Sequence, residues 1–254
     1  MAAPLHILAI EISNPGAGIR TDDAGTRSGP NVALGRAVGS NVQLIDREWL
    51  RPTPVGTRGG IDDDLMPALD RLFKRLGTPA RAWLRAERAS RVAVSIGPGG
   101  YTSVRIACAA GKMIAEAAGA KAVAVPTDAA LARAARRDPT LIGPLAVVLA
   151  GKGDSAWARI HTSDEVHPTQ PGRLITAADL PTMRIGALVA DAHLPRDMRT
   201  VAEGLGLRIV EPTYDAAAVV ELGALLPAID PVELNPLYPR EPDAVTLWRA
   251  RGKA

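Results

Sequence analysis

The sequence predicts an α/β protein built from two related halves with mixed sheets. Its 254 residues are enough to bury a large hydrophobic core. Two strand-rich segments, Leu5 to Trp49 and Leu145 to Ile160, are each followed by helical sequence. Strands and helices alternate between them, an order typical of parallel strands with crossover connections. We therefore expect an N-terminal half over residues 1–142 and a smaller C-terminal half over residues 143–254.

The N-terminal half begins with three expected strands. The aliphatic run from Leu5 to Ile12 suits a buried strand. Two more strands are expected at Val32 to Val38 and Val42 to Trp49. Between the first two, residues 13–30 are rich in Gly, Asp, Thr and Pro and form a loop longer than most connections in a compact domain.

A helix is expected next, from Asp62 to about Leu76. The three aspartates at 62–64 can cap its start. Its core-facing side carries Leu65, Leu69, Leu72 and Leu76. A basic stretch starts within this helix and comprises Arg71, Lys74, Arg75, Arg81, Arg85, Arg88 and Arg91. Such a stretch could meet RNA phosphates, although a solvated helical surface explains it more simply.

The sharpest local signal is a glycine turn. A buried strand from Arg91 to Ile96 leads directly into GPGGYTS at residues 97–103, and a helix then runs to about Ala118. A turn of this kind can present backbone N–H groups to a phosphate. A dinucleotide fingerprint would need glycine at Thr102, and a P-loop would need a hydroxyl residue at Met113. A tight turn without any ligand remains the commonest use of this pattern.

The remaining elements continue the alternation. A strand at Lys121 to Val125 and a helix from Thr127 to about Arg137 complete the first half. The second half is expected to contain strands at Leu145–Leu149, Ser155–Ile160 and Ala187–Ala190, and helices at Pro195–Gly204 and Ala216–Leu226.

Composition excludes several classes of protein. With 47% hydrophobic but only 3% aromatic residues, the core must consist of small and branched aliphatic side chains. The single cysteine, Cys108, excludes an internal disulfide and suits a reducing cytoplasm. No apolar run approaches the length of about 18 residues that a membrane helix needs. We therefore expect a cytoplasmic protein without membrane contact.

Metal-binding and nucleophilic residues are also poorly placed. None of the four histidines, His6, His161, His167 and His193, lies three or four residues from another, so no helix face offers two imidazoles to one zinc ion. Cys108 lies among alanines in the middle of an expected helix, where a thiol packs as a small hydrophobic group. The sequence thus predicts neither a metal site nor a catalytic residue.

The segment from Gly97 to Ala132 resembles the signature region of the TsaB family, which takes part in tRNA threonylcarbamoyladenosine biosynthesis. Members typically read Gly-Pro-Gly-Ser-Phe-Thr-Gly-x-Arg. The matching positions are Gly97, Pro98, Gly99, Thr102 and Arg105, with the conservative Tyr101, whereas Gly100 and Ser103 depart. Similar pieces in the family's order are Ile7–Ile10, Leu65–Leu69 and Tyr238–Pro242.

The resemblance implies a duplicated actin-like, ribonuclease H-like fold and a non-catalytic subunit. Its partner would be a TsaD-like catalytic subunit, with a TsaE-like ATPase as a further partner and a homodimer when alone. Transfer RNA would be reached indirectly, and no cofactor is required because ATP and metal belong to the partners. Members usually have Asp-Thr-Ser at the end of the first strand, where this chain has Glu11-Ile12-Ser13. The second half of members often opens with another aspartate, at the position of Ala150 in this chain. The remaining candidates for nucleotide binding, all degenerate, are Glu11, Gly97 and Gly99.

The resemblance also implies that two helices form the partner interface, as a helical bundle. The expected interface residues are Leu65, Leu69, Leu72, Arg105, Ala107, Ala110, Gly111, Ile114 and Ala118. The small residues of the second helix would let another helix approach closely, but they could equally lie against the protein's own sheet. If they form the interface, arginine at Ala107 or Gly111 should abolish partner binding and leave the fold intact.

Two other classes of protein remain as alternatives. A nucleotide-dependent kinase or carbamoyltransferase of the same fold would use Glu11 and the turn at Gly97, although it lacks the second acid. The hypothesis of a dinucleotide-dependent oxidoreductase has less support, because Thr102 occupies the position of the third glycine in the dinucleotide-binding motif.

Overall fold

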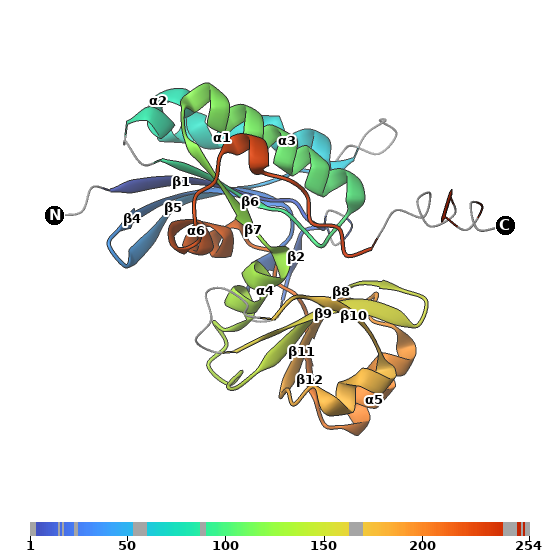
Figure 1. Ribbon diagram of the computed structural model, residues 1–254. Helices are drawn as coiled ribbons and strands as arrows, with labels where there is room; N and C mark the ends of the chain where they lie inside the picture. The colour runs from blue at the N-terminus through green and yellow to red at the C-terminus, as the bar shows by residue number, and fades with distance from the viewer. Residues whose placement is uncertain are drawn as a thin grey trace.

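The computed structural model has two halves, each built around a five-stranded sheet (Figure 1). It describes residues 4–14, 16, 18–22, 25–52, 60–86, 90–162, 170–240, 248–249 and 251, without the side chain of residue 150. His167 and Arg88, both singled out above, lie outside these ranges.

The first sheet has the order β5-β4-β1-β6-β7. Its strands are β1 (Leu5–Glu11), β4 (Asn31–Val38), β5 (Asn41–Trp49), β6 (Arg91–Ser95) and β7 (Lys121–Val125). β4 runs antiparallel to both β1 and β5, whereas β6 is parallel to β1 and to β7. A short hairpin of β2 (Arg20–Thr21) and β3 (Arg27–Ser28) lies within the long loop after β1.

The second sheet repeats this arrangement in the order β10-β9-β8-β11-β12. Its strands are β8 (Leu145–Lys152), β9 (Ser155–His161), β10 (Arg173–Thr176), β11 (Ala187–Ala190) and β12 (Arg208–Val210). β9 is antiparallel to β8 and β10, and β11 is parallel to β8 and β12. Because order and direction agree between the sheets, the structure confirms the duplicated ribonuclease H-like, actin-like fold.

Helices cover both faces of the first sheet. α1 (Leu65–Leu76), α2 (Ala80–Arg85) and α3 (Tyr101–Ala118) lie over one face, and α6 (Ala216–Leu225) lies over the other (Figure 1). β1 contributes side chains to the cores on both faces. Leu8 and Ile10 belong to the core under α1–α3, whereas Ile7 and Ala9 belong to the core under α6. Its aliphatic run therefore reflects burial on both sides.

The second sheet lies between α4 (Thr127–Ala135) and α5 (Arg196–Gly204). Thus α4 follows the first sheet in sequence but packs on the second, while α6 follows the second sheet but packs on the first (Figure 1). The two helices also contact each other. The boundary at residue 142 remains a prediction, and the segment around α6, expected in the C-terminal half, packs on the sheet of the N-terminal half.

After α6 the chain runs back along the first half. Ile229 pairs with Ala122 at the edge of β7, and Leu234, which follows the 3-10 helix η4 (Pro231–Glu233), is fully buried in the core under α3. The amide of Leu237 then donates to the Ile96 carbonyl over 2.8 Å. Residues 229–240, which we call the C-terminal strap, are therefore held at several points. Two further 3-10 helices are η2 (Ile61–Asp64) and η3 (Ala177–Thr182).

Candidate functional site

A cleft lies between the two halves, where a duplicated α/β fold is expected to hold a ligand. Its volume is about 300 Å³. The residues that line it are Asn14, Pro98, Gly99, Gly100, Leu149, Gly151, Asp191, His193 and Tyr214. The two features that the sequence predicted for nucleotide binding, the end of β1 and the glycine turn, lie next to this cleft. Their contacts decide whether they are free to bind a nucleotide.

The glycine turn is held tightly by the protein itself. The Gly97 amide donates to Thr127 Oγ1 over 3.0 Å, and the Gly100 amide donates to the Ser13 carbonyl over 2.6 Å. A Cβ atom on Gly99 would lie 2.2 Å from that same carbonyl oxygen. Gly97 adopts a φ of +106°, a conformation that other residues avoid. The glycines are thus required to pack the turn against β1, and two of its N–H groups are unavailable to a phosphate.

Glu11 is buried and is not among the residues that line the cleft. Its side chain is only 1% exposed, and Oε1 accepts hydrogen bonds from the Ser13 amide at 2.8 Å and the Ser13 hydroxyl at 2.5 Å. Oε2 has no hydrogen-bond partner among the described residues. Burial raises the pKa of Glu11 above its ordinary value of 4.5. Glu11 thus offers no exposed carboxylate for a metal-nucleotide, and its carboxyl is engaged by Ser13 instead.

Replacing Glu11 with glutamine is expected to change the pH dependence of stability. Since the folded protein keeps the Glu11 proton at pH values where the unfolded chain has lost it, the free energy of unfolding falls as pH rises from about 4.5 through the folded pKa. Glutamine cannot ionise, so the stability of Glu11→Gln relative to the parent should increase with pH over this range. Urea unfolding of both proteins at several pH values measures the difference, and a pH-independent difference would contradict the prediction.

His6 and Cys108 have structural environments. His6 stacks on Trp83 with ring centroids 4.3 Å apart, and its Nδ1 lies 3.1 Å from the Trp83 carbonyl. Burial raises the pKa of the Cys108 thiol to about 11, so that it stays protonated at neutral pH. Within the described ranges, no group of three or more His, Cys, Asp or Glu side chains could hold a metal ion, and no helix is long and apolar enough to span a bilayer.

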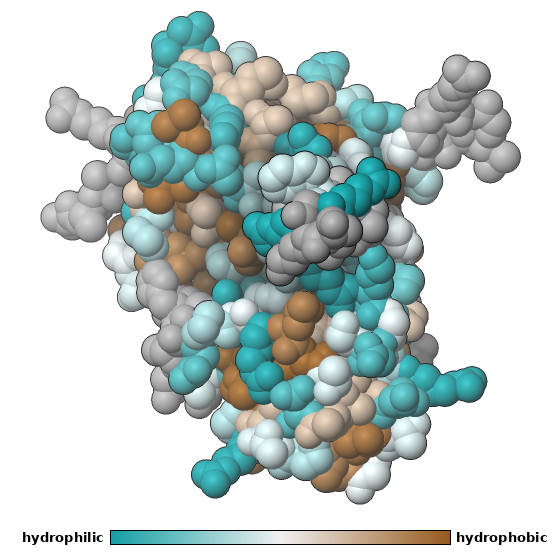
Figure 2. Space-filling model, turned by 45° about the vertical axis from the view of Figure 1, so that its right-hand side comes forward, coloured by the Kyte–Doolittle hydropathy of each residue, from teal (hydrophilic) through white to brown (hydrophobic). Residues whose placement is uncertain are grey.

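A second cavity is an open groove on the outer face of the first half. It has a volume of about 500 Å³ and lies between α1, the segment that leads into α2, and α3. Its lining residues are Leu8, Met66, Leu69, Asp70, Phe73, Lys74, Gly77, Thr78, Pro79, Ala80 and Ile114. On the face seen in Figure 2, apolar residues form separate patches with polar residues between them. The groove instead combines apolar side chains from two long helices into one hollow, which is typical of a helix-binding surface.

Most of the predicted interface residues do not face this groove. Seven of the nine are buried within the protein, namely Leu65, Leu69, Leu72, Ala107, Ala110, Gly111 and Ala118. The small-residue face of α3 packs inward, since a Cβ atom on Gly111 would lie 2.5 Å from Val94 and 3.1 Å from Leu234. The small side chains of α3 thus pack within the chain, and their role at a partner interface remains a prediction. Leu69 and Ile114 do line the groove, and Arg105 is exposed elsewhere on α3.

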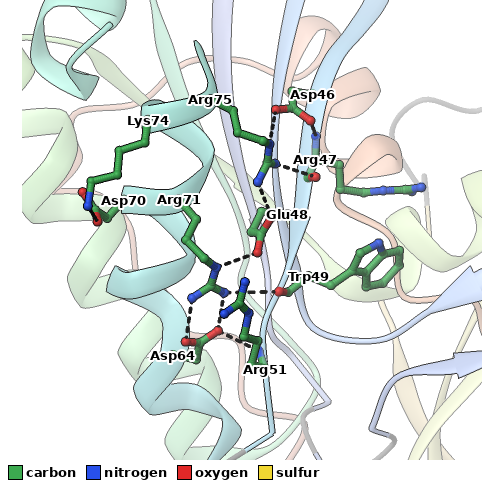
Figure 3. A network of polar contacts seen from close by, with 10 residues as sticks. All are labelled: Asp46, Arg47, Glu48, Trp49, Arg51, Asp64, Asp70, Arg71, Lys74 and Arg75. Carbon is green, nitrogen blue, oxygen red and sulfur yellow. Dashed lines mark hydrogen bonds and ion pairs between the residues drawn. The ribbon is translucent and has the colours of Figure 1, made fainter. Parts of the chain in front are cut away.

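The basic stretch that starts in α1 is largely occupied by contacts within the chain. Arg71 pairs with Glu48 and Asp64, each at 2.6 Å, and Arg75 pairs with Asp46 at 3.0 Å and with Glu48 (Figure 3). Burial tends to raise the pKa of Glu48, but the hydrogen bonds and charges of both arginines hold it below its ordinary value. These arginines fasten α1 to β5 and do not form a free surface for RNA phosphates.

Arg85 and Arg91, later in the basic stretch, also contact the protein itself. Arg85 donates to the carbonyls of Ala117 and Ala118, and Arg91 donates to carbonyls at the end of α6. The sequence could not reveal this, because the acids come from β5 and the carbonyls from distant helix ends. The simpler interpretation of the stretch, a helical surface, is the better one.

A buried ionic cluster links α4 to the second sheet, and no sequence pattern indicated it. Asp128 is fully buried and its Oδ2 lies 3.1 Å from Arg159 Nη1 and 2.9 Å from His161 Nε2. The guanidinium of Arg159 also lies over the Trp157 ring at 5.1 Å. The cluster holds the interface between the halves. Its two partners are spaced two residues apart on one strand, and only the fold brings them to Asp128.

Comparison with known proteins agrees with the resemblance found in the sequence. Residues 62–166 match the sequence model of the family described as TsaD: tRNA N6-adenosine threonylcarbamoyltransferase. No curated protein sequence matches the chain. A Pseudomonas aeruginosa protein described as uncharacterized and similar to the peptidase YeaZ has a similar structure, with a TM-score of 0.62, 15% identity and coverage of 94% of this chain and 100% of that chain. YeaZ from the same organism has a TM-score of 0.61 and 14% identity, with coverage of 94% of this chain and 100% of that chain. At these identities the structural likeness establishes the fold.

Proposed function

We propose that the chain is a non-catalytic subunit that binds and supports a TsaD-like catalytic subunit in a tRNA threonylcarbamoyladenosine-forming complex. The observation that carries the proposal is the apolar groove between α1 and α3, on a fold shared with YeaZ structures over the whole of their chains. The segment that matches the TsaD family, residues 62–166, contains both helices.

The groove suits an amphipathic helix of a partner. Leu8, Leu69 and Phe73 provide apolar side chains, while Asp70 and Lys74 form an ion pair over 2.7 Å at its border. Met66 is 48% exposed, so its flexible side chain can adapt to a partner surface. Leu8, Leu69 and Phe73 are already buried and form the floor of the groove. Covering the exposed side chains, above all Met66, would therefore contribute most of the binding free energy, with the polar border fixing orientation.

In this proposal the partner performs the chemistry. The TsaD-like subunit transfers the threonylcarbamoyl group and, with a TsaE-like ATPase, holds the ATP and metal, while this chain positions the catalytic subunit. Transfer RNA is then bound mainly by the partner. In the absence of the partner, a second copy of this chain can cover the same groove, which would give a homodimer.

Arginine at Met66 is expected to abolish partner binding and leave the fold intact. The substitution places a charge in the groove, where it loses water without gaining a partner in the complex. The affinity for the TsaD-like protein of the same host, measured by isothermal titration calorimetry, should fall at least about a hundredfold. Leu205→Arg is a matched control, because Leu205 is 46% exposed and lies beyond α5 in the other half. Equal binding by a folded Met66→Arg would refute the groove as the interface.

The competing hypothesis of an independent nucleotide-dependent enzyme is tested on the same material. The purified chain is titrated with magnesium-ATP, and the expected result is no saturable binding at micromolar concentrations, because Glu11 and the glycine turn are engaged within the protein. Micromolar affinity together with no bound partner would favour the enzyme.

A further inference from the structure

Two of the protein's three tyrosines face each other on its surface. Tyr101 opens α3 and is 56% exposed, and Tyr238 lies in the C-terminal strap and is 40% exposed. Their ring centroids are 5.2 Å apart with 30° between the planes. Tyr214, by contrast, is buried at 2% exposure. The chain has few aromatic residues, and these two rings lie side by side on the surface and add little to the hydrophobic core. Such an arrangement indicates a binding surface.

One cationic side chain lies beside this pair, and a second lies further along α3 next to the strap. The Arg105 guanidinium lies 5.0 Å from the centre of the Tyr101 ring and donates to its hydroxyl over 3.0 Å. Lys112 lies two turns further along α3 and contacts Asn235 of the strap at 3.3 Å. Neither cation forms an ion pair with an acid in the described ranges. This contrasts with Arg71 and Arg75, whose charges are balanced by carboxylates.

The surface is ordered before any ligand arrives. Leu234 and Leu237 anchor the strap in the first half, and beyond Tyr238 the Arg240 side chain donates to the carbonyl and hydroxyl of Ser155 at 3.1 and 3.0 Å. Tyr238 is therefore fixed between anchors on both halves. Tyr101 directly follows Gly100, which lines the central cleft. A preformed surface loses little conformational entropy on binding.

We propose that Tyr101 and Tyr238, together with Arg105 and Lys112, form a stacking site for unpaired bases of single-stranded RNA. Exposed rings offer planes on which bases stack, and the unbalanced cations meet the phosphates between them. The proposal goes beyond the subunit role above, in which RNA is bound mainly by the partner. It is also independent of the partner, because the chain alone should bind the RNA.

The test uses a fluorescein-labelled, unstructured oligoadenylate of about twelve nucleotides, within the usual range of single-strand sites. Fluorescence anisotropy at low salt should show saturable binding to the wild-type protein and weaker binding to an RNA duplex of the same length. Tyr101→Ala and Tyr238→Ala should each raise the dissociation constant about tenfold. Tyr101→Phe keeps the ring and should bind nearly as well as the parent.

Salt dependence provides a second readout for the cations. Arg105→Gln should reduce the slope of log K against log salt by about 0.7, the value for one phosphate contact on a single strand. Leu205→Ala, at an exposed position remote from the tyrosines in sequence, is the control and should behave as the parent. Circular dichroism verifies that each variant is folded.

Failure of the proposal has two distinct forms. Wild-type protein that binds no RNA at low salt overturns it, and so do folded tyrosine variants that bind RNA as tightly as the parent. If Tyr101→Ala instead weakens binding of the TsaD-like protein and leaves RNA binding unchanged, the surface is a protein contact. Met66→Arg distinguishes the two proposals, since it should lose the partner and retain the RNA.

Discussion

An alanine in place of Asp128 is expected to lower the free energy of unfolding by about 3–5 kcal/mol, the usual cost of removing one partner from a buried ion pair. The carboxylate is fully buried, and its loss leaves Arg159 and His161 facing a cavity without a negative charge. The His161 side chain is 5% exposed and that of Arg159 14%, so solvent can replace the lost contacts only in part. Urea unfolding followed by circular dichroism measures the change.

Asp70→Ala is the matched control for this experiment. Asp70 also pairs with a cation, Lys74, at 2.7 Å, but both side chains are more than half exposed. Its removal should cost about 0.5 kcal/mol or less. Similar losses of unfolding free energy in the two variants would mean that the buried ion pair of Asp128 stabilises the protein no more than the exposed pair of Asp70. A stable Asp128→Ala protein would show that the halves do not depend on this cluster.

Arginine at Gly111 is expected to prevent stable folding, with a loss of more than about 4 kcal/mol. Gly111 lies where α3 approaches β6 and the C-terminal strap, and its added Cβ would already overlap Val94 and press on Leu234. Even alanine should cost about 1–3 kcal/mol through overpacking. Arginine must in addition bury a charge or displace the strap. Thermal unfolding followed by circular dichroism tests both variants.

Ala109→Arg controls for the general effect of arginine in α3. Ala109 is exposed, two residues from Gly111 on the same helix, and arginine is a good helix former. This variant should melt close to the parent. The result expected for Gly111→Arg is the opposite of the one predicted from sequence, where an intact fold with lost partner binding was anticipated. A folded Gly111→Arg protein would restore that earlier interpretation.

The sequence predicted most helices and strands, because hydrophobic periodicity and turn residues are local signals. The strand at Lys121–Val125 and the helix that ends at Ala118 have the predicted ends. The missed elements include α2, β10, β12 and the short strands β2 and β3, which have two to six residues. Such short elements carry too little pattern to be recognised, and contacts with neighbouring strands or helices stabilise them.

The site was harder to predict than the fold. A row of small residues in α3 indicates close packing, yet it cannot reveal whether the neighbour is another protein or the same chain. Gly111 and Ala107 turned out to face the protein's own core. The glycine turn posed the same problem, since its N–H groups could point to a phosphate or, as found at Gly100, to Ser13. Both questions depend on contacts between residues that are distant in sequence.

The exchange of α4 and α6 between the halves has a consequence for synthesis on the ribosome. The face of the first sheet that carries Ile7, Ala9 and Ala93 is covered by α6, which is translated after all strands of both sheets. This apolar face therefore stays open while the second half is being made, and a nascent chain is exposed to aggregation during that time. The first half therefore cannot complete its core until α6 has been translated, after all the strands of the second half.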